Sequence, residues 1–309
     1  MLFFGTPEFA VPTLARLLVG PHRVVAVVTQ PDRPRGRGQK VTPSPVAELA
    51  ERSALPILRP EQIGEPAIAE TLREFSADLG IVVAFGQFLP KRVRELPRLG
   101  YLINAHASLL PRHRGAAPIA HAILAGDLET GISVMRVERA MDAGPSAVVC
   151  RTPIAADETT GELTERLAAL AADAIAEAVD LVAKGRIIWT PQDDARATLA
   201  PKLGPADALL DWREAAVALA RRVRAMAPRP GAFTTLQNER LRILAATALA
   251  VRCEDAPGTL RLGGDAPLRI ATGEGWLAPR VLQRAGGKPL DVDVFLRGHP
   301  LVDGACTGG

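Results

Sequence analysis

The residues of this 309-residue sequence whose types and spacing best suit chemistry are an asparagine, a histidine and an aspartate. Asn104 and His106 are two positions apart at the carboxyl end of a predicted strand, so on an extended backbone both side chains project the same way. Asp142 lies in the loop-like segment Met141-Asp142-Ala143-Gly144. In acyl transfer, amide and imidazole donors stabilise the developing oxyanion, and a nearby carboxylate can accept the proton of the attacking amine. The three residues together indicate acyl transfer.

These residues also have a purely structural interpretation, which their spacing leaves open. Asparagine and histidine near a strand end often cap loops, and Asp-Ala-Gly is an ordinary turn.

Two phosphate-binding patterns are missing from the sequence. The first strand is followed by Gly5-Thr6-Pro7 instead of Gly-x-Gly-x-x-Gly, and no Gly-x-x-x-x-Gly-Lys-Ser/Thr occurs. Their absence weighs against hydride transfer and nucleotide hydrolysis.

The first half of the chain alternates short apolar runs with segments of helical periodicity. This alternation is typical of an α/β fold, in which a parallel sheet carries helices on its faces. Asn104 and His106 then fall at the carboxyl end of a strand, where such sheets bind ligands. The predicted strands are 2–4, 24–29, 56–58, 79–84, 101–105 and 132–136, and the predicted helices are 9–18, 66–75 and 160–183.

The texture of the sequence changes near Trp189. Residues 190–206 are polar and rich in proline, which predicts a linker between a domain at 1–189 and another at 207–309. A helix is predicted from Asp211-Trp212 to Met226. Short predicted strands follow, separated by Gly, Pro and Asp, and suggest a small β-barrel. These strands are 241–245, 258–261, 268–272 and 276–281.

Composition narrows the class of protein. Hydrophobic residues make up 48% and charged residues 23%, which is ordinary for a globular protein. No apolar run reaches the roughly 18 residues of a membrane helix, and no secretory signal opens the chain, so we expect a cytoplasmic protein without a membrane partner. The three cysteines are far apart, so neither a disulfide framework nor a metal site is expected.

Positive charge is concentrated in two places. Residues 1–206 contain 23 Lys/Arg and 23 Asp/Glu, whereas residues 207–309 contain 14 and 11, so the surplus lies in the C-terminal part. Residues 31–45 form a proline- and glycine-rich segment, predicted to be a long loop, whose cations are set against a single acid, Asp32. Such a loop suits a phosphate backbone, although a solvated surface loop is the plainer interpretation. Its cations are Arg33, Arg35, Arg37 and Lys40.

Several motifs resemble a known family. The run Asn104-x-His106-x-Ser108-Leu109-Leu110-Pro111, with Arg114-Gly115, Pro118 and Asp142-x-Gly144, is similar to the signature of folate-dependent formyltransferases. The N-terminal Gly5-Thr6-Pro7-Glu8-Phe9-Ala10 and the segment 29–46 more narrowly resemble the branch that acts on methionyl-tRNA. The likeness extends from residue 1 to about residue 290, so it covers nearly the whole chain.

The resemblance implies a Rossmann-like catalytic domain followed by an OB-like barrel. It implies that Asn104, His106 and Asp142 are catalytic, and that 10-formyltetrahydrofolate donates the formyl group. Phe85 departs from the tyrosine more common in the family, which removes one hydroxyl from the expected folate wall. The residues expected at the folate are Ser108, Leu109, Leu110, Pro111, Val83, Ala84, Phe85 and Gly86.

The resemblance also implies a partner, initiator methionyl-tRNA, in translation initiation. Arg37 occupies the position expected to enter the acceptor arm, with Arg33, Arg35 and Lys40 beside it. We expect a monomer. Formyl transfer to glycinamide ribonucleotide or an amino sugar, and formyltetrahydrofolate hydrolysis, remain alternatives because they use the same three residues. A noncatalytic RNA-binding protein with a decayed α/β domain is the alternative outside enzymes.

Overall fold

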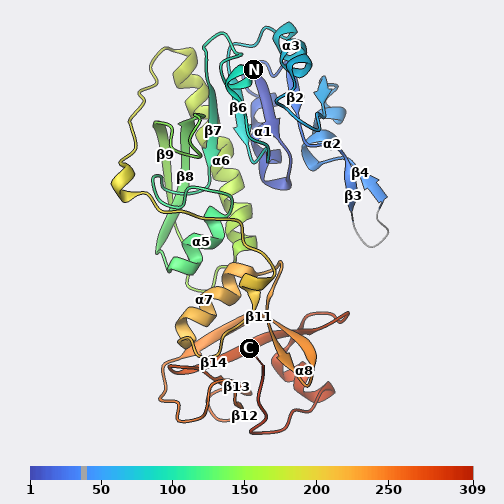
Figure 1. Ribbon diagram of the computed structural model, residues 1–309, viewed down its shortest axis with the longest axis vertical. Coiled ribbons are helices and arrows are strands. Elements are labelled where there is room, and N and C mark those ends of the chain that lie inside the picture. The colour runs from blue at the N-terminus through green and yellow to red at the C-terminus, as the bar shows by residue number, and fades with distance from the viewer. Residues whose placement is uncertain (36–39, 309) are drawn as a thin grey trace. The chain divides into compact units, whose positions relative to one another are not determined.

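A computed structural model describes residues 1–35 and 40–308, which divide into two compact units. The first unit comprises Met1–Pro118, Glu129–Pro153 and Thr164–Pro201. The second comprises Ile119–Leu128, Ile154–Leu163 and Lys202–Gly309. Two short segments, 119–128 and 154–163, therefore group with the C-terminal part. Figure 1 shows the elements in chain order.

The first unit is built on a seven-stranded sheet with the order β5-β2-β1-β6-β7-β8-β9. The five strands from β5 to β7 are parallel, and β8 and β9 continue the sheet in antiparallel pairing. The prediction of a mostly parallel sheet is thus confirmed. The strands are β1 (Leu2–Gly5), β2 (Ala26–Val28), β5 (Ile57–Leu58), β6 (Gly80–Val83), β7 (Leu102–His106), β8 (Glu129–Arg136) and β9 (Ser146–Pro153).

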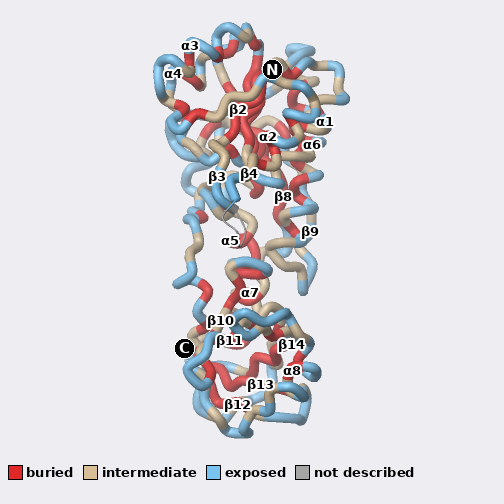
Figure 2. Tube along the Cα trace, turned by 90° about the vertical axis from the view of Figure 1, so that its right-hand side faces the viewer, coloured by how far each residue is buried: buried red, intermediate tan, exposed pale blue. Residues whose placement is uncertain are grey.

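Helices lie on both faces of this sheet. Figure 2 shows α3 and α4 on one side of the strands and α1 and α6 on the other. Burial from both sides explains why the central strands are continuously apolar and do not alternate with polar residues. The helices of this half of the chain are α1 (Val11–Leu18), α2 (Pro45–Arg52), α3 (Pro66–Glu74), α4 (Lys91–Arg94), α5 (Pro118–Ala125) and α6 (Thr160–Ala183).

Four of these elements were not predicted: α2, α4, α5 and β9. For α2 the local signal is clear in retrospect. The Ser44 hydroxyl caps the helix by accepting a hydrogen bond from the Ala47 N–H at 3.1 Å, and Pro45 occupies the first helical position. Helix α5 has apolar residues around most of its circumference, so it lacks the periodicity that marks an amphipathic helix.

The second unit is built on antiparallel strands in the order β10-β11-β14-β13-β12, with β15 paired to β14. Helix α7 (Ala216–Met226) begins four residues later than the predicted start at Trp212. The Trp212 side chain is nevertheless buried, and its indole N–H donates to the Thr234 hydroxyl at 3.1 Å. The strands are β10 (Ala232–Leu236), β11 (Glu239–Leu249), β12 (Leu260–Leu262), β13 (Leu268–Ala271), β14 (Trp276–Arg284) and β15 (Leu290–Asp291), followed by helix α8 (Val292–Gly298).

The segment 31–45, predicted to be a loop, is partly regular. Strands β3 (Arg33–Arg35) and β4 (Lys40–Thr42) pair in antiparallel fashion, with Arg33 opposite Thr42 and Arg35 opposite Lys40. The loop prediction was therefore wrong for these six residues, because proline and glycine content outweighed a weak strand pattern. Arg37 lies outside the described residues.

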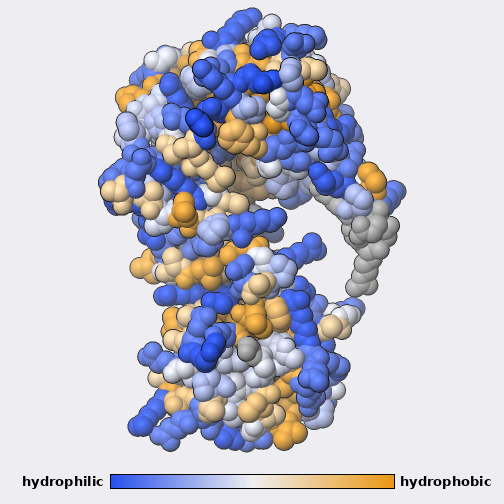
Figure 3. Space-filling view, in the orientation of Figure 1, coloured by the Kyte–Doolittle hydropathy of each residue, from blue (hydrophilic) through white to orange (hydrophobic). Residues whose placement is uncertain are grey.

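The face shown in Figure 3 is mostly hydrophilic, with hydrophobic side chains in small scattered groups. Such scattered groups are normal for folded proteins. Among the described residues, no helix combines the length and the apolar character that a membrane crossing requires.

Candidate active site

Strand β7 carries Asn104 and His106 to the carboxyl end of the parallel strands. Asn104 pairs in register with Val82 of β6 on one side and with Met135 of β8 on the other. His106 is the last residue of β7 and lies opposite Ser133. Both side chains share one face of the strand, as their spacing predicted. The sheet therefore places an amide and an imidazole at the carboxyl ends of its parallel strands, where ligands bind in folds of this class.

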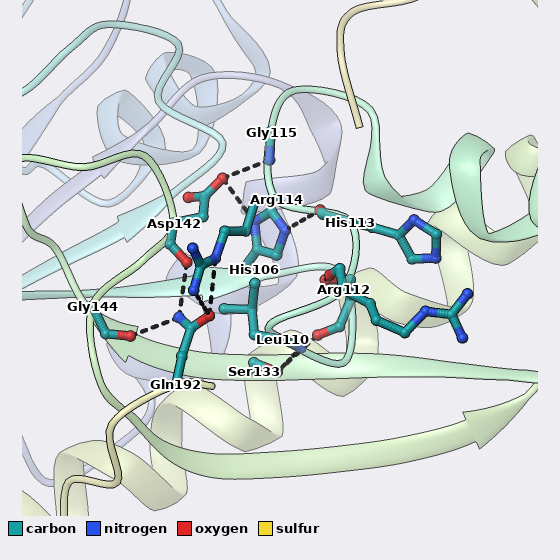
Figure 4. A network of polar contacts seen from close by, with 11 residues as sticks. His106, Leu110, Arg112, His113, Arg114, Gly115, Ser133, Asp142, Gly144 and Gln192 are labelled. Atoms are coloured by element: carbon teal, nitrogen blue, oxygen red, sulfur yellow. Dashed lines mark hydrogen bonds and ion pairs between the residues drawn. The ribbon is translucent and has the colours of Figure 1, made fainter. Parts of the chain in front are cut away.

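His106 and Asp142 form a shielded pair (Figure 4). The His106 Nδ1 lies 3.5 Å from the Asp142 Oδ2, and the two side chains are only 6% and 15% exposed. The same Oδ2 accepts a hydrogen bond from the Gly115 N–H at 2.9 Å. Asp142 has a φ of 51°, in the left-handed region that aspartate tolerates better than most residues. The turn thus aims the carboxylate back at the ring.

The other ring nitrogen of His106 is bonded to the main chain. Its Nε2 lies 2.8 Å from the His113 carbonyl oxygen, and a carbonyl can only accept, so Nε2 carries the hydrogen. His113 also has a positive φ, 59°, which turns its carbonyl towards the ring. Both nitrogens of His106 therefore face groups of the protein, and the plane of the imidazole is fixed between them.

The predicted folate segment after β7 is held by two serines. The Ser108 hydroxyl donates to the Arg112 carbonyl at 2.6 Å. The Ser133 hydroxyl donates to the Ser108 carbonyl at 2.8 Å and accepts from the Leu110 N–H at 3.1 Å. Ser108 is fully buried, so its hydroxyl shapes the loop, while Leu110 remains partly exposed. The contacts of this segment with a folate stay a prediction.

Two residues of the network were missed from the sequence: Gln192 and the side chain of Arg114. Gln192 donates through Nε2 to the Asp142 and Gly144 carbonyls, at 2.8 and 2.7 Å. Arg114 donates to the Gln192 Oε1 at 3.1 Å from Nε and 2.8 Å from its terminal nitrogen. Gln192 lies in the segment predicted as a linker, 50 residues from Asp142. No local pattern indicates such a contact.

The second predicted folate group lines a cavity at the end of β6. This cavity has a volume of about 400 Å³ and brings Ala84, Phe85 and Gly86 together with Arg33. Val83 is fully buried at the end of β6. The lining residues are Thr6, Pro7, Gln30, Pro31, Arg33, Ala84, Phe85 and Gly86.

Two further residues of this cavity, Thr6 and Gln30, were also missed. The Thr6 hydroxyl and the Gln30 amide both donate to the Phe85 carbonyl, at 2.9 and 3.2 Å. The Phe85 ring packs edge-on against Phe4, with the ring centroids 5.6 Å apart. The first turn of the sheet and the end of β6 therefore form one wall. The Gly5-Thr6-Pro7 turn was the available signal for Thr6.

The cations predicted to bind tRNA are exposed where the structure describes their side chains. The Arg33 side chain is 65% exposed and reaches Glu61 at 3.9 Å. Lys40 is exposed at the start of β4. Asp32, the acid of this segment, pairs with Arg59 at 3.1 Å. The positive charge of Arg33 and Lys40 is therefore turned outward, while the acid of the segment is occupied.

Comparison with known proteins identifies the family. Residues 1–179 match the family described as Formyl transferase, and residues 202–300 match Formyl transferase, C-terminal domain. A methionyl-tRNA formyltransferase of Halorhodospira halophila is 46% identical over 304 residues, covering 98% of this chain and 97% of the relative. The chain belongs to the methionyl-tRNA formyltransferase family. A second methionyl-tRNA formyltransferase, from Stutzerimonas stutzeri, is 48% identical over 290 residues, covering 94% and 91% of the two chains.

Solved structures share the fold of this methionyl-tRNA formyltransferase family member at low identity. The sugar 3N-formyl transferase WlaRD aligns with a TM-score of 0.67 and 14% identity, covering 93% of this chain and 98% of the other. A methionyl-tRNA formyltransferase from Clostridium thermocellum aligns with a TM-score of 0.55 and 13% identity, covering 81% and 94%. These likenesses show that the fold recurs among formyltransferases.

Proposed function

We propose that this protein transfers the formyl group of 10-formyltetrahydrofolate to the free amino group of methionine on initiator methionyl-tRNA, for translation initiation. The observation that carries the proposal is the shielded pair of His106 and Asp142 at the end of β7, with 3.5 Å between Nδ1 and Oδ2. A shielded carboxylate and a buried imidazole, with an amide side chain two residues before the imidazole, suit an acyl transfer that develops and discharges one negative charge.

In the proposed mechanism, Asn104 and His106 stabilise the oxyanion. The methionine nitrogen attacks the formyl carbon, and the C=O π electrons move onto the formyl oxygen. Asn104 donates its amide N–H to that oxygen. His106 adds a second donor when its Nε2–H exchanges the His113 carbonyl for the oxyanion. Removing a donor of this kind typically costs about 10² to 10³ in rate.

Asp142 handles the proton in the same mechanism. Its carboxylate accepts the proton from the attacking nitrogen, directly or through one water. As the carbonyl reforms, the bond from the formyl carbon to the donor nitrogen breaks. The leaving nitrogen takes up the proton that Asp142 received, so charge and protons balance over the cycle.

The two groups of predicted folate residues support a donor site beside this pair. They follow the neighbouring strands β6 and β7, whose carboxyl ends are adjacent because Val82 pairs with Asn104. The cavity of about 400 Å³ at Ala84–Gly86 has apolar walls with carbonyl and amide groups between them. A flat heterocycle with polar edges suits such a lining.

For tRNA, the proposal assigns Arg37, Arg33, Arg35 and Lys40 to the acceptor arm and residues 207–309 to backbone contacts. The outward charge of Arg33 and Lys40 and the cationic surplus after residue 206 support this assignment. Residues 1–189 would then carry catalysis, and 190–206 would connect the two functions. We further propose that the enzyme is a cytoplasmic monomer, which sedimentation of the purified protein would test.

The deciding experiment offers the protein a choice of acceptors. Purified protein is incubated with 10-formyltetrahydrofolate and either charged initiator tRNA, glycinamide ribonucleotide or an amino sugar, and the formylated product is identified. Formylation of methionyl-tRNA alone is expected. Formylation of a small amine would favour another formyltransferase, release of formate without an acceptor would favour a hydrolase, and RNA binding without formyl transfer would favour a noncatalytic protein.

A further inference from the structure

The carboxamide of Gln192 fixes the turn that carries Asp142. Its two N–H bonds reach two carbonyls that are two residues apart, those of Asp142 at 2.8 Å and Gly144 at 2.7 Å. One side chain therefore bridges both ends of the turn. Because Asp142 holds a left-handed φ, its main chain needs such support to keep the carboxylate aimed at His106.

Arg114 fixes the orientation of that carboxamide. Its guanidinium donates two hydrogen bonds to the Gln192 Oε1 and a third to the Asp194 carboxylate at 2.7 Å. The Arg114 side chain is only 11% exposed, so the amide oxygen must face the cation and the amide nitrogen must face the turn. Arg114 also lies between His113, whose carbonyl bonds to His106, and Gly115, whose N–H bonds to Asp142.

The segment that carries Gln192 is anchored before and after it. Before it, Thr190 and Ser146 exchange two main-chain hydrogen bonds, of 2.9 and 2.8 Å. The Arg136 guanidinium lies over the Tyr101 and Trp189 rings, 4.3 and 4.7 Å from their centroids. The start of the segment is therefore held against the strands that flank the Asp142 turn.

After Gln192, the segment pairs with the loop that follows β7. The Arg114 N–H donates to the Thr198 carbonyl at 2.8 Å, and the Ala200 N–H donates to the Arg114 carbonyl at 2.7 Å. The Thr198 hydroxyl accepts from the His113 N–H at 2.9 Å. One strip of chain thus holds both loops that meet at the pair of His106 and Asp142 (Figure 4).

We propose that Gln192 is a positioning residue of the active site, which holds the Asp142 carboxylate at the His106 ring by bonding to the main chain of the Asp142 turn. Arg114 is its partner and sets the direction of its amide. This inference rests on the proposed function, because it assigns a role in the transfer step. It predicts that losing the carboxamide lowers kcat while leaving the KM for either substrate nearly unchanged.

Three variants separate the parts of this contact. Gln192→Ala removes it entirely. Gln192→Glu keeps the size and the oxygen that faces Arg114, but it replaces the donor nitrogen with an oxygen that repels two carbonyls. Arg114→Lys keeps a positive charge near Asp194 but loses the paired donation to Gln192. Because a displacement of about 1 Å can cost roughly 10²-fold in rate, kcat should fall about 10- to 100-fold for both Gln192 variants and less for Arg114→Lys.

A control lies on helix α3. The Thr71 hydroxyl donates to the Ala67 carbonyl at 3.1 Å. Thr71→Ala also removes a hydrogen bond from a side chain to a main-chain carbonyl, but no catalytic turn depends on it, so kcat should stay within about twofold of the wild-type value. The comparison separates the position of Gln192 from the general loss of such a bond.

The experiment measures kcat, both KM values and the histidine side-chain NMR signals of each variant. The expected result is a lower kcat, unchanged KM values and a shifted His106 resonance for Gln192→Ala and Gln192→Glu. Wild-type kcat in Gln192→Glu, or an unmoved His106 resonance, would overturn the inference. If Gln192→Ala does not fold, Gln192→Glu and Arg114→Lys decide alone. Absence of formyl transfer in the wild-type protein would instead refute the proposed function.

Discussion

The loops after β7 and β8 differ from the β3–β4 hairpin in how closely other protein groups contact their polar side chains. His106 and Asp142 are 6% and 15% exposed, and each faces a main-chain partner in addition to the other. Arg33 is 65% exposed and has an acidic neighbour only at the edge of contact distance, 3.9 Å. The groups proposed to act on a bond are thus held by the protein itself, whereas the charges proposed to meet tRNA are left to solvent.

The largest effect on turnover is expected from substitutions in the shielded pair of His106 and Asp142. His106→Ala or Asp142→Asn should lower kcat by about 10² to 10³, because each loses stabilisation that matters only in the transition state. Single-turnover formylation measures the loss, and circular dichroism should be unaltered.

A second histidine and aspartate pair provides the control. The His22 Nε2 lies 2.9 Å from the Asp180 Oδ1, but these side chains are 32% and 50% exposed. His22→Ala should leave kcat within about twofold, because exposed ion pairs contribute little. Near-normal turnover in His106→Ala would remove the basis for the catalytic assignment.

The next effect tests how tightly the Asp142 turn must be held. A methyl group at Gly144 would collide with the Arg136 carbonyl oxygen, so Gly144→Ala should displace the turn and lower kcat by roughly 10²-fold. Gly64→Ala is the control, because its methyl group would meet only the Pro90 Cγ at an ordinary 3.7 Å. Equal turnover of the two variants would show that the turn tolerates movement.

A smaller effect is expected from substitutions of the arginines at 31–45, which should alter the KM for methionyl-tRNA. Arg33→Ala and Arg37→Ala should each raise the KM for methionyl-tRNA about tenfold, leave folate binding unchanged and reduce the salt dependence of tRNA binding by about one phosphate contact. Arg16→Ala is the matched control, since Arg16 is half-exposed and lies 3.6 Å from Asp173. A salt slope identical to that of the wild-type protein would exclude these arginines from the tRNA interface.

The smallest effect concerns Asp211, a partly exposed carboxylate that accepts hydrogen bonds from Arg213 in its own turn. Hydrogen bonds from Arg213 lower the pKa of Asp211 from 3.8 to about 2. The folded state therefore favours the ionised carboxylate, so its contribution is present above about pH 4 and is lost as the pH falls towards 2. Because the Asp211 side chain is 37% exposed and that of its partner Arg213 is 84% exposed, solvent screens their contact, and Asp211→Asn should barely alter the melting temperature between pH 2 and 5. A large change there would show that exposed charges in this protein contribute more to folding than the contrast implies.

Much of the frame follows from the sequence. The strand predicted at 101–105 corresponds to β7 (Leu102–His106), which extends one residue further to include His106, and the strand prediction at 132–136 falls within β8. Apolar runs determine buried parallel strands directly, because both faces are covered. By contrast, helix α7 starts after Trp212, since the buried indole belongs to a preceding turn that bonds to Thr234. Periodicity alone cannot separate a helical residue from an adjacent core residue.

The candidate site also contains residues that the sequence could predict and residues that it could not. The chemistry of Asn104, His106 and Asp142 could be proposed from residue type, spacing and resemblance. The role of Gln192 could not, because it depends on contacts with residues 48 to 78 positions away and on main-chain carbonyls. Main-chain groups carry no sequence signature, so the partners that orient a catalytic side chain become visible only with the fold.

The bond from His106 to the His113 carbonyl has a consequence for timing. A hydrogen bond to a neutral acceptor such as this carbonyl is worth about 0.5 to 1.5 kcal/mol net, whereas a bond to a charged acceptor is roughly twice as strong. In the proposed mechanism, His106 exchanges the His113 carbonyl for the formyl oxygen. This exchange becomes favourable only when negative charge has formed on the formyl oxygen. The Nε2–H of His106 would then stay on the His113 carbonyl in the presence of an uncharged substrate or a water molecule, and it would turn to the formyl oxygen only as the reaction proceeds.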